Sequence, residues 1–300
     1  QMCIRDRSGA GVNLPEHGGG SPLYIACYRG HDETVQILLN KGANVNQCKS
    51  NGATPLYAAC QNGRGSIVQL LLCNGANASI CMNDGAGPLF VACQNGHKTV
   101  VETLLEIDAD INLCMGDGTS PLYVASQRGH ENIIQLLMDR GAQVNLCNKN
   151  SSSPLYAACF WGYCSIAQLL LNNGAHINQC LDDGSSPLHA SCFGGYDSIV
   201  QYLLKNGADL NLCDKDGSGP LYRACQFGHK TTVQILLDNN ANLNSCTKIG
   251  ASPLYGACEN GHVDVVQLLI KNGAELNLAV MDDNSPLLVA CQNGHHTTVQ

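Results

Sequence analysis

The sequence predicts an all-α repeat solenoid, in which stacked helix-turn-helix units of 33 residues are joined by β-hairpin-like loops and curve around a concave face. Nine of the ten prolines recur at a spacing of 33 residues without a slip. Each of these prolines is followed eight residues later by a glycine, and sixteen residues later by a leucine wherever the chain reaches that far. A fixed period of this length is typical of a chain built from one repeated supersecondary unit. The nine prolines are Pro22, Pro55, Pro88, Pro121, Pro154, Pro187, Pro220, Pro253 and Pro286.

The first helix of each unit is predicted to begin at the proline. Ser or Thr precedes the proline in seven of the nine repeats, as Thr54 precedes Pro55. A hydroxyl side chain followed by proline is typical of a helix N-cap and the first helical residue. The glycine eight residues later, such as Gly63, supplies the backbone freedom that a helix C-terminus uses.

A second helix is predicted between that glycine and the next Gly-Ala pair. In the second repeat, Val68, Leu71 and Leu72 form one apolar stripe at helical spacing, and Asn51-Gly52 marks the hairpin that leads into this repeat. Helices of roughly eight to ten residues are too short to persist alone in water. Each unit is therefore expected to be stable only when neighbouring units cover its faces.

The repeated phrase Ser-Pro-Leu-Tyr-x-Ala-Cys-x-x-Gly-His, followed by Val-Gln-x-Leu-Leu-x-x-Gly-Ala-x-x-Asn, resembles the ankyrin repeat. The resemblance covers residues 8–300 and implies the fold described above. The family usually carries His in its Thr-Pro-Leu-His motif, but this chain keeps it only at His189, with Tyr in six repeats and Phe90 and Leu288 in the others. The hydrogen bonds of that His must therefore be met differently in most repeats.

The repeat phase divides the chain into four segments. Residues 1–7 do not match, and Met2-Cys3-Ile4-Arg5-Asp6 resembles a translated transposase sequencing adaptor, so this segment is interpreted as an adaptor-derived artefact. Residues 8–20 are interpreted as the end of a truncated preceding repeat, 21–284 as eight complete repeats and 285–300 as a truncated ninth. The chain is thus expected to be a fragment of a longer protein.

Composition disfavours several classes of function. The net charge of −8, with only 16 Lys and Arg, does not suit a surface that follows nucleic-acid phosphates. No apolar run approaches a membrane span, and no phosphate-binding loop, nucleophile elbow or His-Glu-x-x-His motif occurs. We therefore expect no cofactor and no catalysis from this segment.

Fifteen of the eighteen cysteines form two ladders at repeat spacing. One ladder lies five residues after the proline (Cys27, Cys60, Cys93, Cys159, Cys192, Cys225, Cys258, Cys291) and the other seven residues before it (Cys48, Cys81, Cys114, Cys147, Cys180, Cys213, Cys246). Equivalent positions in stacked helices are roughly 8–10 Å apart, too far for a disulfide or shared metal. We interpret the cysteines of the first ladder as small buried residues. For the hairpin ladder, the alternative to an indifferent small residue is a row of reactive thiols. So many unpaired thiols fit a reducing compartment, so we expect the protein to be cytoplasmic.

Binding is expected where the repeats differ while the frame stays constant. The residues six and seven after the proline are mostly Gln-Asn, but they become aromatic at Tyr28, Phe160-Trp161, Phe193 and Phe227. In ankyrin-like proteins this location lines the concave surface, and clustered aromatics are typical of interface hot spots. The alternative is that the rings merely fill space between repeats. Variable hairpin charges are expected nearby, including Lys149, Asp182 and Lys215.

The resemblance also implies a candidate modification, because ankyrin repeats offer a hairpin Asn to asparaginyl hydroxylases, with an acidic residue two positions earlier. Asn112, Asn211 and Asn277 fit that pattern. The function predicted overall is a monomeric scaffold that holds other proteins. The alternatives are a targeting arm of a larger enzyme or channel, and a mechanical spacer.

Overall fold

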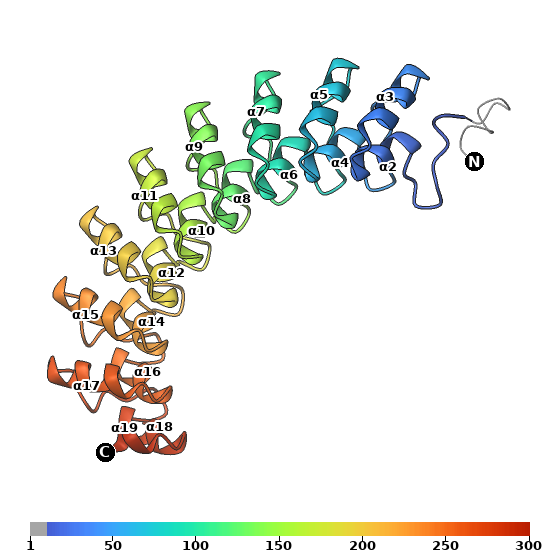
Figure 1. The fold of residues 1–300 in the computed structure, drawn as a ribbon. Coiled ribbons are helices and arrows are strands. Elements are labelled where there is room, and N and C mark those ends of the chain that lie inside the picture. The colour runs from blue at the N-terminus through green and yellow to red at the C-terminus, as the bar shows by residue number, and fades with distance from the viewer. Residues whose placement is uncertain (1–10) are drawn as a thin grey trace. The chain divides into compact units, whose positions relative to one another are not determined.

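The computed structural model describes residues 11–300, so the interpretation of residues 1–7 lies outside the described residues. Within the described range the chain forms eighteen α-helices and no β-strand (Figure 1). The helices follow one another in pairs, as the 33-residue period predicts. The chain divides into two compact units, with the boundary between Lys149 and Asn150. We call them unit 1 and unit 2 and describe each by itself.

Unit 1 contains four helix pairs. Their bounds are α2 Pro22–Arg29 and α3 Asp32–Asn40, α4 Pro55–Gln61 and α5 Gly65–Cys73, α6 Pro88–Gln94 and α7 Lys98–Glu106, and α8 Pro121–Arg128 and α9 Glu131–Asp139. First helices pack against first helices of the next pair, and second helices pack against second helices. The unit therefore has two helical layers.

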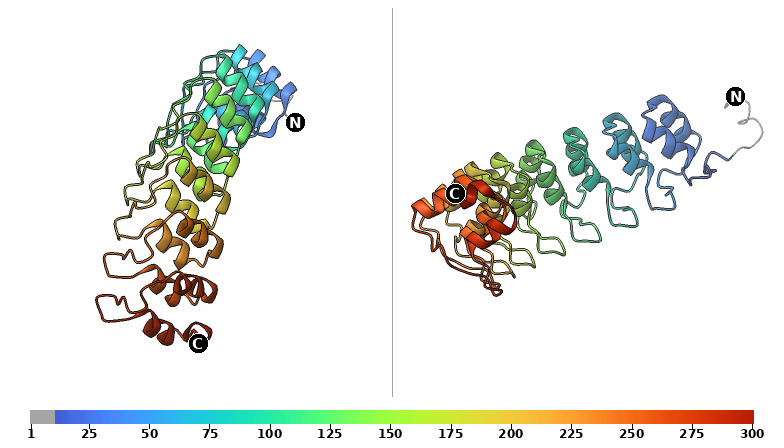
Figure 2. Two further views of the ribbon diagram at one scale, coloured as in Figure 1. Left: turned by 90° about the vertical axis from the view of Figure 1, so that its left-hand side faces the viewer. Right: turned by 90° about the horizontal axis from the view of Figure 1, so that it is seen from below.

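Unit 2 contains five pairs with the same arrangement. Their bounds are α10 Pro154–Phe160 and α11 Cys164–Asn172, α12 Pro187–Gly194 and α13 Asp197–Lys205, α14 Pro220–Gln226 and α15 Lys230–Asp238, α16 Pro253–Glu259 and α17 Val263–Lys271, and α18 Pro286–Gln292 and α19 His296–Val299. In each unit the loops between pairs project from the same side of the stack (Figure 2).

Local chemistry sets where each first helix begins. The Thr54 hydroxyl accepts a hydrogen bond from the Tyr57 amide at 3.0 Å, and Ser153 caps Tyr156 in the same way at 3.1 Å. Gly87 and Gly219 occupy the N-cap without a side-chain bond. Ser or Thr followed by Pro therefore forms the N-cap and first helical residue that the sequence predicted.

The core of each unit lies between its two helical layers. The leucines sixteen residues after the proline are fully buried in the interior repeats, as at Leu71 and Leu104 in unit 1 and Leu170 and Leu203 in unit 2. Small residues such as Ala92 line the first helices and are equally buried. This pairing of large and small side chains lets neighbouring first helices pack closely.

The histidines after the helix-ending glycines connect neighbouring repeats. The Nε2–H of His97 donates to the carbonyl of Gln61, 36 residues earlier, at 3.1 Å, and His262 donates to Gln226 at 3.0 Å. Since Gly63 has a φ of +65° and a Cβ there would lie 2.6 Å from the His97 ring, the glycine gives the ring its space. These histidines therefore link each repeat to the one before it.

Candidate aromatic interface

Four aromatic side chains gather at the ends of consecutive first helices in unit 2. Phe160 ends α10, Trp161 follows it, Phe193 lies in the last turn of α12 and Phe227 follows α14. Their exposed fractions are 37%, 51%, 42% and 41% respectively. We call these four residues the aromatic cluster. Each ring is therefore half-buried, unlike the fully buried leucines of the core.

The rings of the aromatic cluster contact one another across three repeats. Phe160 stacks on Phe193 with ring centroids 5.8 Å apart, and Phe193 meets Phe227 edge to face at 4.4 Å. Trp161 lies edge-on to Phe160 at 5.5 Å, and Tyr156 stacks on Phe160 from one turn below at 6.3 Å. Offset-stacked and edge-to-face arrangements are the ones that the quadrupoles of aromatic rings favour.

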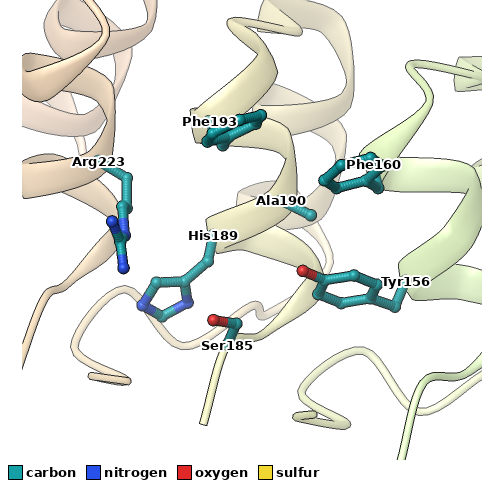
Figure 3. Close-up of a pocket in the computed structure, with 7 residues that line it drawn as sticks. All are labelled: Tyr156, Phe160, Ser185, His189, Ala190, Phe193 and Arg223. Atoms are coloured by element: carbon teal, nitrogen blue, oxygen red, sulfur yellow. The ribbon is translucent and has the colours of Figure 1, made fainter. Parts of the chain in front are cut away.

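A depression of about 230 Å³ lies against this cluster. Phe160 and Phe193 line its upper part, and Tyr156, Ser185 and His189 lie below them (Figure 3). The Arg223 side chain reaches toward His189 from the next repeat (Figure 3). The depression thus offers an apolar wall beside a few polar groups, a composition typical of binding sites.

His189 is locked in place at the floor of the depression. It is 3% exposed, and its Nδ1 accepts a hydrogen bond from the Ser186 amide while its Nε2–H donates to the Ser218 carbonyl at 3.0 Å. Burial lowers the pKa of His189 from its ordinary value. The ring is therefore held neutral, with the proton on Nε2, as a structural link to the next repeat.

Arg223 and Asp214 form an ion pair at the edge of the same depression. The Arg223 guanidinium donates to a carboxylate oxygen of Asp214 at 2.6 Å and to Gln226 at 3.1 Å. The other Asp214 oxygen accepts from the amides of Asp216 and Ser218, both at 2.9 Å. Asp214 thereby organises its own hairpin and neutralises the guanidinium.

Beyond Arg223 lies a second depression of about 250 Å³. It is lined by Asp216, Tyr222, Arg223 and Lys248, among others. Burial, followed by the negative charge of Glu259, raises the pKa of Tyr222 to about 12. Because Arg223 lines both depressions, they adjoin along the first helices and hairpins of unit 2.

The remaining candidate binding residues lie in different surroundings. Asp182 and Lys215 are exposed on hairpins of unit 2, where the Lys215 amide donates to the Asp183 carbonyl. Tyr28 and Lys149 belong to unit 1; Tyr28 stacks on Tyr24 at 6.4 Å, and Lys149 is exposed. The structure therefore brings together Phe160, Trp161, Phe193 and Phe227, and these define the candidate site.

The sequence reasoning missed Arg223 and Asp214. A signal for both was present, because the position of Arg223 holds only small or aliphatic residues in the other repeats, such as Ala190 and Gly256. A single charge at such a position needs a partner nearby. Asp214, nine residues earlier, supplies that partner.

The three candidate hydroxylation residues lie in the hairpins. Asn112 is half-buried, and its Oδ1 accepts from the Gln143 amide of the next repeat at 2.9 Å. Asn211 and Asn277 are exposed. Asn46 and Asn178, at the same position, make the same inter-repeat bond as Asn112. The hairpin Asn therefore has a structural role, and its hydroxylation stays a prediction.

The first-helix cysteines are buried from Cys27 to Cys258, as predicted, but Cys291 in the last repeat is exposed, and the hairpin cysteines are half-buried or exposed. Burial raises the pKa of Cys159 to about 12 and that of Cys258 to about 11. In the hairpin ladder, burial also raises the pKa of Cys114 and Cys147, and each thiol donates to the carbonyl two residues earlier. Since reactivity needs the thiolate, these shifts disfavour a row of reactive thiols.

Between residues 11 and 300, no three or more His, Cys, Asp or Glu side chains are grouped as a metal site. None of the described helices is long and apolar enough to span a membrane.

Comparison with known proteins identifies the repeat. The family model described as "Ankyrin repeats (3 copies)" matches residues 3–84, 23–113, 89–180, 177–247 and 233–300. No curated protein matches the chain. The matches overlap and together extend over nearly the whole sequence, in agreement with the helix pairs of both units. The chain belongs to the ankyrin repeat family.

Proposed function

We propose that this protein is a scaffold without catalytic activity of its own, and that unit 2 holds a protein partner on the concave face formed by its first helices and hairpins. Ankyrin repeats are generally protein-protein interaction modules. The observation that carries the proposal is the aromatic cluster, whose four residues stay 37–51% exposed, whereas the leucines of the core are fully buried. Exposed, mutually contacting aromatics are typical of interface hot spots.

The mechanism is preorganisation. One stacked and one edge-to-face ring contact hold Phe160, Phe193 and Phe227 in place before any partner arrives. When a partner docks on these rings, only the partner loses conformational freedom, because the side chains of the scaffold are already ordered. This lowers the entropic penalty of association. Trp161 is the most exposed of the four rings and is expected to be covered by the partner.

The test compares two matched double variants in affinity capture from the source organism, with quantitative mass spectrometry as the readout. Trp161→Ala/Phe193→Ala removes two rings of the cluster, whereas Gln61→Ala/Gln94→Ala removes two amides at the equivalent place in unit 1. Each hot-spot residue is worth at least about 2 kcal/mol, so the first variant should retain a genuine partner more than about 30-fold less well. The second variant should retain it as the wild type does. The proposal would be contradicted if the wild type and both double variants captured the same proteins in the same amounts.

We also propose that the protein works in the cytoplasm. The support is the number of free thiols: all seventeen cysteines in residues 11–300 are unpaired. Such usage fits a reducing compartment. Alkylation of thiols in intact cells before lysis tests this, because the exposed Cys48, Cys213 and Cys246 should be captured as free thiols. Their recovery as mixed disulfides would contradict it.

A further inference from the structure

Acidic side chains are concentrated on one part of unit 2. Its second helices carry three acidic and three basic residues, which balance: Asp197, Asp238, Asp264, Lys205, Lys230 and Lys271. Its first helices and loops carry nine Asp and Glu but only three Lys and Arg. The entire negative excess of unit 2 therefore lies on the elements that present the aromatic cluster.

Unit 1 shows the opposite balance on the same elements. Between residues 11 and 149, its first helices and loops carry five Asp and Glu and seven Lys and Arg. The negative excess is thus a property of unit 2 and not of the repeat frame.

Several of these acids lie beside the two depressions. Asp183 accepts from the amide of Ser185, which lines the first depression, and Asp216 lines the second. Glu259 ends α16, close enough to Tyr222 to contribute to its raised pKa. The cations on the same elements are Arg223, which Asp214 neutralises, with Lys215 and Lys248. The four acids and three cations named here leave one net negative charge beside the depressions, which favours a cationic ligand.

We propose that the occupant of this face is a polypeptide segment that combines apolar side chains with Lys or Arg. This inference rests on the proposed function and adds the chemistry of the partner. The apolar side chains enter the first depression against Phe160 and Phe193. A guanidinium or ammonium group lies over the exposed face of Trp161, where the ring quadrupole attracts a cation. Further basic groups meet the carboxylates of Asp216 and Glu259, which would steer the segment and fix its register.

The first test is selection from a displayed library of random peptides, with wild type as the target and Trp161→Ala/Phe193→Ala as the counter-target. Peptides that bind only the wild type should be enriched in Lys and Arg over Asp and Glu, together with Leu or aromatic residues. Ring-dependent peptides that are neutral or acidic would overturn the inference and leave the proposed function intact. If every peptide also binds the counter-target, or if the chain forms dimers that the ring substitutions dissolve, both proposals fail.

A second measurement isolates the charges on the selected peptides. Asp216→Asn/Glu259→Gln should weaken their binding about threefold to tenfold at low ionic strength, as expected for two partly exposed charges, and the loss should shrink in high salt. Asp238→Asn/Asp264→Asn removes the same charge from the second helices and should leave affinity unchanged. Trp161 is the only tryptophan of the sequence, and its fluorescence reports binding in the wild type and in both charge variants. Equal affinities for both charge variants would overturn the inference.

Discussion

The two units place different side chains at the ends of equivalent first helices. In unit 1, the amide of Asn62 donates to the Ala58 carbonyl at 2.9 Å, and that of Asn95 donates to Val91 at 3.1 Å. The Val91 carbonyl also accepts from the Asn95 backbone amide at 3.1 Å, so the side chain adds a second hydrogen bond there. In unit 2, Trp161 and Phe227 stand where those asparagines stand, and only their backbone amides donate to the equivalent carbonyls, both at 3.2 Å. The aromatic rings therefore replace a side chain that bonds to the helix end, which favours a role in binding over a role in the fold.

The last repeats of unit 2 return to the amide pattern. Asn260 donates to the Gly256 carbonyl of its own helix at 2.9 Å, and Asn293 donates to the Glu259 carbonyl of the preceding repeat at 2.8 Å. Within unit 2, the aromatic residues thus interrupt the pattern in the first three repeats. The first helices of these repeats have seven or eight residues, as they do in the other repeats. The frame and the candidate site can therefore be tested separately.

The largest expected effect tests whether the two units share one frame. Leu104→Ala in unit 1 and Leu170→Ala in unit 2 remove fully buried side chains at the same repeat position. Each should lower the free energy of unfolding by about 2–5 kcal/mol, because both substitutions leave a cavity. Urea unfolding followed by circular dichroism measures the loss. A large loss from one substitution and none from the other would break the equivalence.

The frame was predictable because each of its positions has a local cause. Ser or Thr before Pro caps a helix through its own hydroxyl, and the glycine eight residues later adopts a φ of +65° at Gly63 and +67° at Gly195. The sequence predicted neither the Arg223–Asp214 ion pair nor the inter-repeat hydrogen bond of His97. Both depend on which side chain faces which across a loop or a repeat, and spacing alone does not specify that.

The aromatic cluster was predictable for a different reason. A fixed frame makes any departure visible, so Phe160, Trp161, Phe193 and Phe227 stood out against the Gln-Asn background. The sequence did not reveal the ring contacts or the adjoining depressions, which depend on rotamers. It also gave no sign of the division at Lys149, because the repeat phase continues across it.

A smaller effect should appear with acid at His189 in unit 2. His189 replaces the Tyr that unit 1 carries at three of the equivalent positions, and burial lowers its pKa in the folded state. As the pH falls below about 6.5, His189 therefore takes up a proton in the unfolded chain before it does so in the folded chain. The free energy of unfolding decreases over this range, until the pH falls below the folded-state pKa of His189. His189→Tyr should remove this part of the pH dependence.

The measurement is the difference in unfolding free energy between wild type and His189→Tyr at pH 7 and at pH 5. This difference should shift against the wild type at the lower pH. A difference that does not change with pH would show that the histidine is not held neutral in the folded state.

The smallest expected effect concerns backbone strain at the ends of second helices. Asp108 in unit 1 and Asn240 in unit 2 adopt φ values of +56° and +63° where the other repeats have glycine. Because glycine adopts this conformation without a steric penalty, Asp108→Gly should stabilise unit 1 by about 0.5–1 kcal/mol. Asn240→Gly should gain less, since asparagine tolerates positive φ better than most residues. Thermal unfolding of both variants checks the order, and a loss of stability in either would contradict it.

The central claim is that the aromatic cluster serves binding and not the core. The double variant Trp161→Asn/Phe227→Asn installs the asparagine that unit 1 carries at Asn62 and Asn95. The most direct measurement is the free energy of unfolding of this variant in urea, monitored by circular dichroism. The new amides add side-chain hydrogen bonds at two helix ends while two half-exposed rings are lost, so we predict a change in unfolding free energy within about 1 kcal/mol of wild type. A loss of about 3 kcal/mol or more, comparable to Leu170→Ala, would contradict the account, because it would show that the rings belong to the packed core.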